Sequence, residues 1–222
     1  MNSVSSNQDT RQNKVNNFQL MLDDIKADID RYVYGDNLPW QIVLLKKQGV
    51  WATIQYRFSR WVHYHLHIPV LRQIMKIFCV IWRQFIEMIS GIELPNRAEI
   101  GKGIYIPHPY GIVIHCDAKL GENANLGQDI AIGVAGRGEK RGVPKIGDRV
   151  FIAPGAKIFG DISIGNDVAI GANAVVTKDL PDLAVAVGIP AKVISYKGSK
   201  DFIFYRGKES EQVSELVTQE QK

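Results

Sequence analysis

The sequence predicts a mainly β protein, in which a solenoid of short parallel strands follows an α-helical N-terminal domain. Three observations support this fold class. An aliphatic residue returns at every sixth position through much of the second half, apolar residues in the first ninety positions follow helical spacing, and a glycine-rich segment interrupts the period of six. A chain of 222 residues, 45% hydrophobic and 23% charged, is long enough for one or two ordinary globular domains.

The period of six is the strongest of these signals. The leading aliphatic residues are Ile114, Leu120, Leu126, Ile132, Ile146, Ile152, Ile158, Ile164, Ile170 and Val176, and a two-residue phase shift near His108 separates them from Ile100 and Ile106. Such a period fits neither a helix of 3.6 residues per turn nor a long alternating strand. It predicts short strands joined by sharp corners, with three hexads to each triangular coil and coils stacked about 4.8 Å apart. The stacked coils form a three-sided prism.

Composition and periodicity divide the chain into four segments. Low hydrophobicity predicts disorder, and helical spacing of apolar residues predicts helices. Three glycines where the aliphatic residues of the period of six are missing predict a loop. The expected segments are a disordered lead-in at 1–17, a helical domain at 18–91, a β-helix domain at 92–195 with a loop at 134–142, and a C-terminal tail at 196–222. We expect the short apolar run at 202–205 to cap the open end of the prism or to pack on a neighbour.

Charge and cysteine content narrow the class of protein. The two cysteines, Cys79 and Cys116, give no disulfide framework, which favours a reducing cytoplasm. No apolar run is long enough to span a bilayer. Basic residues gather between Trp40 and Ser90, where Glu87 is the only acid. This predicts either a solvated basic face or peripheral contact with an anionic inner membrane surface, and no motif for nucleic acid accompanies it.

Several motifs resemble those of the hexapeptide-repeat acyltransferases. They lie at 101–114, 143–147 and 187–192, and the resemblance covers roughly residues 28–194, closest to the serine acetyltransferase-like branch. The resemblance implies a left-handed parallel β-helix that uses acetyl-CoA. It also implies a homotrimer with each site between two prisms, and the helical domain offers a way to pair trimers.

His108 is the candidate general base for acetyl transfer to a hydroxyl. It lies at the phase shift between Pro107 and Pro109, where core packing poorly explains a polar ring, and histidine accepts protons near neutral pH. In the resembled enzymes an aspartate fifteen positions earlier orients the catalytic histidine, and Glu93 holds that position here. Glu93 could instead be a surface side chain, and we expect His115 to point outward without a catalytic role.

The resemblance also implies where acetyl-CoA lies. Small residues let a thin pantetheine arm approach the backbone, and a lysine suits phosphate. The candidates are Gly133, Ala153, Pro154, Gly171, Ala172 and Lys192. Each small residue could equally serve only to turn a corner of the prism. We expect no metal, because His63, His65 and His67 alternate along a predicted helix and so diverge.

Two departures from the serine enzymes bear on the acceptor. Pro107 replaces an aspartate that helps hold serine, and Val143 replaces a second histidine. Neither can bind the charges of an amino acid, which argues against free serine. The motif at 107–114 more closely resembles the serine acetyltransferase-like enzymes of surface-polysaccharide clusters. That resemblance implies a sugar hydroxyl as the acceptor, in surface polysaccharide biosynthesis (capsule, O-antigen or exopolysaccharide). The candidate acceptor-binding residues are Tyr110, Arg137 and Arg141 as hydrogen-bond donors, and Asp36 in the helical domain.

Two alternatives remain open at this point. The chain could be a serine O-acetyltransferase of cysteine biosynthesis with a rebuilt amino-acid pocket, which the N-terminal helices and Asp36 favour. It could also be a non-catalytic β-helix scaffold, which His108 in its motif opposes.

Overall fold

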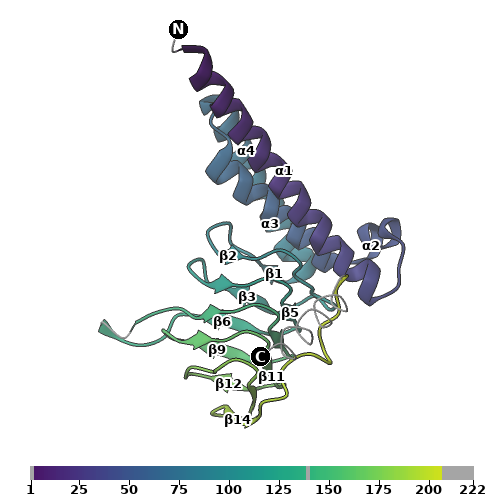
Figure 1. The fold of residues 1–222 in the computed structure, drawn as a ribbon, viewed down its shortest axis with the longest axis vertical. Helices are drawn as coiled ribbons and strands as arrows, with labels where there is room; N and C mark the ends of the chain where they lie inside the picture. Colours follow the sequence, from purple (N-terminus) through teal and green to yellow (C-terminus); the bar gives the residue numbers. More distant parts are fainter. Residues whose placement is uncertain (1–2, 139–140, 207–222) are drawn as a thin grey trace, which may run out of the picture.

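A computed structural model describes the backbone of residues 3–138 and 141–206 and the side chains from Asn17 onward. Helices gather at one end of the molecule and short strands stack beneath them as a prism (Figure 1). The helices are α1 (Ser3–Gly35), α2 (Trp40–Lys46), α3 (Gln48–His65) and α4 (Pro69–Ser90). None of the described helices has the length and apolar character needed to cross a membrane.

The first helix corrects one expectation. The lead-in expected to be disordered over residues 1–17 is helical from Ser3. Its polar composition argued against burial, but the segment contains no glycine or proline before Gly35. A helix that is already nucleated can extend through such residues at little cost.

The last helix has clear sequence signals at both ends. Pro69 occupies its first turn, where a missing backbone N–H costs nothing. Gly91 ends it in the left-handed conformation, with φ of 61°, and donates its N–H to the Glu87 carbonyl at 2.8 Å. Strand β1 begins at the next residue, so α4 enters the prism with a single residue between them.

Three sheets form the sides of the prism. Sheet A contains β1 (Ile92–Glu93), β3 (Ile112–Ile114), β6 (Ala131–Gly133), β9 (Lys157–Phe159) and β12 (Val175–Val176). Sheet B contains β2 (Glu99–Ile100), β4 (Lys119–Leu120), β7 (Lys145–Ile146) and β10 (Ser163–Ile164). Sheet C contains β5 (Asn125–Leu126), β8 (Phe151–Ile152), β11 (Ala169–Ile170), β13 (Val185–Val187) and β14 (Lys192–Ser195). All pairs are parallel except β13–β14.

The hexad aliphatics form ladders inside this prism, which confirms the β-helix prediction. In sheet A, Ile114 pairs with Ile132, Ile132 with Ile158, and Ile158 with Val176. All four side chains are at most 1% exposed. Because each aliphatic stacks on the corresponding residue of the next coil, the core is continuous along the prism.

One ladder substitution tests this packing. We expect Ile132→Val to lower the free energy of unfolding by about 0.5–1.5 kcal/mol, because a buried methylene is lost between two stacked isoleucines. Urea unfolding followed by circular dichroism measures the change. Ile194→Ala, at a side chain that is 64% exposed, is the control and should change little. An equal loss in both variants would contradict the ladder.

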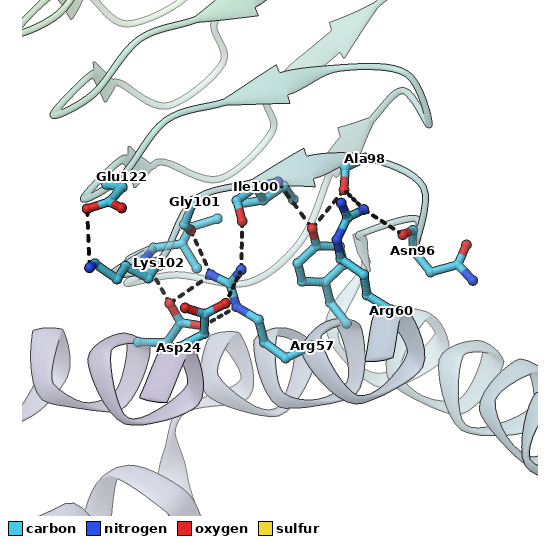
Figure 2. Close-up of polar contacts among 12 residues, drawn as sticks. Asp24, Arg57, Arg60, Asn96, Ala98, Ile100, Gly101, Lys102 and Glu122 are labelled. Carbon is cyan, nitrogen blue, oxygen red and sulfur yellow. Dashed lines mark hydrogen bonds and ion pairs between the residues drawn. The ribbon is translucent and has the colours of Figure 1, made fainter. Parts of the chain in front are cut away.

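Buried polar contacts join the helical domain to the first coil. Arg57 of α3 binds Asp28 of α1 through two hydrogen bonds of 2.9 and 3.1 Å. Arg57 also donates to the carbonyls of Ile100 and Gly101 at 2.6 Å (Figure 2). Asp28 also accepts the Ile104 N–H at 3.0 Å. Burial acts to lower the pKa of Arg57, but the charge of Asp28 and its hydrogen bonds outweigh burial and raise it. The pair therefore fixes the helices on the prism.

The apolar run at 202–205, in the described part of the C-terminal tail, does not cap the open end of the prism. It returns along sheet C toward α1 (Figure 1). Phe202 stacks on Phe151 with ring centroids 4.7 Å apart, and its carbonyl accepts from the Asn125 amide at 2.8 Å. Arg31 of α1 donates to the Phe204 carbonyl at 2.8 Å. These long-range partners hold the apolar run against the side of the prism. The tail beyond Arg206 lies outside the described residues.

Candidate active site

His108 lies at the corner where the chain passes from sheet C to sheet A, here called the C–A corner. Tyr105 pairs with Asn125 on one side of this corner and Val113 pairs with Ala131 on the other. The first coil therefore has two more residues at the corner than the coil below it. These two residues are the phase shift seen in the sequence, and they carry His108 out of the regular corner, where its side chain is exposed.

The backbone on both sides of His108 is held firmly. The Tyr32 hydroxyl accepts the Ile106 N–H at 2.9 Å and donates to the Ile106 carbonyl at 3.0 Å. Tyr110 donates its N–H to the Ser90 carbonyl at 2.7 Å and accepts the Asp129 N–H at 2.9 Å. The corner is thus fixed while the imidazole stays free. Within residues 3–138 and 141–206, no hydrogen bond or ion pair involves the His108 side chain.

Tyr110 stands beside His108 in a strained turn. Its φ is 79° and that of Gly111 is 71°. A Cβ on residue 111 would come within 2.9 Å of the Asp129 Cα, so glycine is needed there. The Tyr110 side chain is 60% exposed. This predicted acceptor-binding residue therefore lies exposed in the same corner as the predicted base, two residues further along the chain.

Glu93 lies on the outer side of sheet A. It pairs with Val113 in the ladder and its side chain is exposed. No hydrogen bond or ion pair joins Glu93 to His108 among the described residues. Its negative charge does act on Glu87, whose pKa is raised by burial, lowered by Arg83 and raised further by Glu93. A single protomer thus does not show the predicted orienting contact.

Four of the predicted acetyl-CoA residues line the same corner below His108. Backbone hydrogen bonds link the successive coils there, from Asp129 to Tyr110, Gly155 to Gln128, Ala153 to Ile170, Asn173 to Pro154 and Gly171 to Ala186. Ala153 and Pro154 therefore lie two coils below His108, and Gly171 and Ala172 three coils below. Lys192 pairs with Val187 at the base of this column. Four coil spacings amount to about 19 Å, so the column suits a long, thin ligand.

Gly133 occupies the opposite edge of sheet A. It ends β6 at the corner where the chain passes from sheet A to sheet B, called the A–B corner. The loop at 134–142 leaves the prism here, closed by a bridge between Ala135 and Gly142, and projects sideways (Figure 1). It carries Arg137 and Arg141, both exposed. Within one chain, these two arginines and Gly133 do not meet His108.

Asp36 lies close to the coil that carries His108. It follows α1 and accepts a hydrogen bond of 2.6 Å from the hydroxyl of Tyr105, three residues before His108. Lys47 pairs with its other oxygen at 2.5 Å. Burial raises the pKa of Tyr105, and Asp36 raises it further. Sequence reasoning missed Tyr105 and Lys47, since nothing local signals that the turn after α1 would meet this coil.

One further cluster was also missed. The donor atoms of His115, Cys116 and Asp117 lie within 4.8 Å of one another, the only such group of potential metal ligands among the described residues. All three are already engaged, since Cys116 Sγ lies 4.0 Å from His115 Nδ1. His115 Nδ1 accepts the Asp117 N–H at 3.1 Å, and Asp117 pairs with Arg97 at 2.6 Å.

A separate cleft of about 450 Å³ lies between α1, α3 and sheet B. Arg57, Arg60, Glu99 and Lys119 contribute to its lining. None of the predicted catalytic, acetyl-CoA or acceptor residues lines it, so it is distinct from the corner that carries His108.

The stacked hexads, the exposed histidine and the column of small residues define a hexapeptide-repeat acetyltransferase that uses acetyl-CoA as co-substrate. A family model described as "Bacterial transferase hexapeptide (six repeats)" matches residues 144–178. A serine acetyltransferase of Helicobacter pylori is 35% identical over 175 residues, which are 78% of this chain and 97% of that protein. The chain belongs to the serine acetyltransferase family.

Other relatives agree with this assignment. A serine acetyltransferase of Synechococcus elongatus is 32% identical over 156 residues, 70% of this chain and 61% of that protein. The structure of Neisseria gonorrhoeae serine acetyltransferase in complex with serine matches with a TM-score of 0.68 and 26% identity, covering 84% of this chain and 74% of that chain. A serine acetyltransferase in complex with CoA matches with a TM-score of 0.67 and 26% identity over 84% of this chain and 74% of that one.

These relatives overturn the expected sugar acceptor and the assignment to polysaccharide biosynthesis. The likeness to the serine enzymes extends over both the helical domain and the prism, whereas the sugar hypothesis rested on Pro107, Val143 and the short motif at 107–114. Two missing side chains show only which groups are absent from the pocket. They do not show which other groups replace them.

Proposed function

We propose that this protein is a serine O-acetyltransferase, which transfers the acetyl group of acetyl-CoA to the hydroxyl of L-serine in cysteine biosynthesis. The observation that carries the proposal is the 35% identity to the Helicobacter pylori enzyme over 97% of that enzyme's length. The match to a serine acetyltransferase solved with serine supports it. Two free cysteines fit a reducing cytoplasm as the place of action.

In the proposed mechanism His108 is the general base. Its imidazole takes the serine hydroxyl proton as that oxygen attacks the thioester carbonyl. A C–O bond forms, the C–S bond breaks, and the thiolate of CoA leaves and receives the proton from the imidazolium. The firm backbone around His108 supports this role, because it places the ring without engaging its nitrogens. Glu93 is the proposed orienting carboxylate, and such contacts often tighten only with substrate bound.

We propose that acetyl-CoA lies along the C–A corner. Ala153, Pro154, Gly171 and Ala172 would flank the pantetheine arm, and Lys192 would meet a phosphate at the base. Pro154, Ala172 and Lys192 are exposed, which supports this placement. Gly133, Arg137 and Arg141 would complete the site from a second protomer, because sheet A separates them from His108 in one chain. This separation supports a homotrimer with its sites between prisms.

Asp36 is the proposed partner of the serine ammonium group, since its carboxylate lies beside the coil that carries His108. We expect Asp36→Asn to raise KM for serine by about 10- to 100-fold, because a hydrogen bond to a charged group contributes roughly 1.5–3 kcal/mol. The kcat and the KM for acetyl-CoA should change little. Asp23→Asn, on α1 at an exposed carboxylate, is the matched control. An unchanged KM for serine in Asp36→Asn would remove this role.

A thiol-release assay with varied acceptors tests the proposed substrate. L-Serine should release CoA well above the background hydrolysis of acetyl-CoA, and D-serine and L-serine methyl ester should be poor acceptors because the chirality or the carboxylate is changed. A panel of free and nucleotide-linked sugars should give only background. Release with a sugar but not with L-serine would reject the proposal.

A further inference from the structure

The outer face of α4 is the largest unexplained feature of the helical domain. Its exposed large apolar residues are Ile68, Val70, Leu71, Ile74, Ile77, Phe78, Val80, Ile81, Phe85 and Met88, the first at its N-cap. Their exposed fractions run from 40% to 74%. A typical monomer shows a largest apolar patch of about 300–600 Å². Ten such side chains leave on the order of 700–1,000 Å² uncovered, close to the roughly 800 Å² that each partner contributes to a standard interface.

A heptad pattern organises this face. Val70, Ile74, Ile77, Ile81, Gln84 and Met88 follow alternating spacings of four and three residues, the spacing of the d and a positions in a coiled coil. Isoleucine stands at one d position and two a positions. Isoleucine at both kinds of position favours three or four strands over two. The pattern therefore indicates that the partner is helical and that three or four helices associate.

The charged side chains of α4 lie away from this apolar face, on the side of the helix toward α3. Cys79, Ile86 and Ser90 are buried on the side toward α3. On this inner side Arg72 donates to the His63 carbonyl at 2.7 Å, and Arg83 pairs with Glu87 at 3.3 Å. The heptad positions carry no charge. An anionic membrane would call for lysines and arginines flanking the apolar face, so the arrangement favours a protein partner over a lipid surface.

The a and d positions of α4 are here called the seam. The geometry of the prism indicates where the seam lies in the assembly, and this step rests on the proposed trimer. If the C–A corner of one protomer meets the A–B corner of the next, sheet A, which lies between those corners, faces the three-fold axis. Helix α4 continues into β1 of sheet A through Gly91 alone. It rises from the end of the prism where β1 lies (Figure 1). Three copies of α4 would thus meet around the same axis.

We propose that the a and d positions of α4 form a parallel three-stranded coiled coil with α4 of two further copies of this chain. The seam would clamp the trimer above the prisms. It would hold the C–A and A–B corners in register and so assemble each active site. The occupant of the apolar face is this chain itself.

Sedimentation of paired variants tests the proposal. Ile77→Asp with Ile81→Asp places charges at the centre of the seam, and we expect the trimer–monomer midpoint to move at least tenfold toward higher protein concentration. Leu45→Asp with Ile194→Asp is the matched control, at side chains 71% and 64% exposed elsewhere. It should sediment like the wild type. A trimer unaffected by the Ile77 and Ile81 pair would overturn the proposal.

Cross-linking tests the proposal even where the variant with Ile77→Asp and Ile81→Asp does not fold. Ile77→Cys in a Cys79→Ser, Cys116→Ser background should give dimers with a short bis-maleimide, whereas Leu45→Cys in that background should not. No cross-link at position 77 would overturn the seam. Wild-type sedimentation with anionic vesicles, lost in the charged pair while the trimer persists, would assign the face to a membrane instead. Serine turnover is measured separately, so the seam and the proposed function can fail independently.

Discussion

Replacing His108 with alanine should lower serine-dependent release of CoA by about 10²- to 10⁴-fold, the usual contribution of a general base. The loss should fall on kcat, because alanine leaves the acetyl-CoA column untouched. The unfolding midpoint should not change, since the His108 side chain is exposed and unbonded within the described residues. Steady-state kinetics with saturating acetyl-CoA and varied L-serine measure the effect.

His67→Ala is the matched control for this prediction. His67 is an exposed histidine in the short connection between α3 and α4. The control should retain wild-type turnover. If His108→Ala kept more than a tenth of the wild-type kcat, another group would have to take the hydroxyl proton, and the proposed mechanism would be wrong.

Breaking the buried pair between Arg57 and Asp28 should have the largest effect on stability. The two side chains are 4% and 1% exposed. Removing Asp28 leaves the buried Arg57 guanidinium with only the partly exposed Asp24, 3.6 Å away, as a counterion. Losing the buried partner of such a pair costs about 3–5 kcal/mol. We therefore expect Asp28→Ala to lower the free energy of unfolding by that amount. Urea unfolding followed by fluorescence of the tryptophans in α3 and α4 reports on this end of the molecule.

A surface pair and a double variant sharpen this test. Arg97→Ala breaks a pair whose side chains are 60% and 52% exposed, and it should change the free energy of unfolding by no more than about 1 kcal/mol. Asp28→Leu combined with Arg57→Leu should be less destabilised than Asp28→Ala, because no unpaired charge remains. If Asp28→Ala cost as little as Arg97→Ala, the pair would not hold the helices on the prism.

The sequence was most informative where structure depends on near neighbours. The hexad period predicted the ladders because each coil repeats one local geometry, and Pro69 and Gly91 mark the ends of α4 through effects that are local. The phase shift likewise predicted the unusual corner at His108. The handedness of the coil came from the resemblance to a family, since spacing carries no information about hand.

The remaining features depend on contacts between distant residues. Polar composition suggested disorder before Phe18, but it could not show that the helix continues to Ser3. The path of the tail depends on Asn125, Phe151 and Arg31, none of which lies near the tail in sequence. The acceptor was predicted wrongly because Pro107 and Val143 were considered without the rest of the pocket.

Chemical identification of the product tests the central claim most directly. Purified protein with acetyl-CoA and L-serine should form O-acetyl-L-serine and CoA in equal amounts, identified by mass spectrometry, and His108→Ala should form almost none. Formation of CoA without O-acetyl-L-serine, or of an acetylated sugar in its place when sugars are supplied, would contradict the assignment of this protein as a serine O-acetyltransferase.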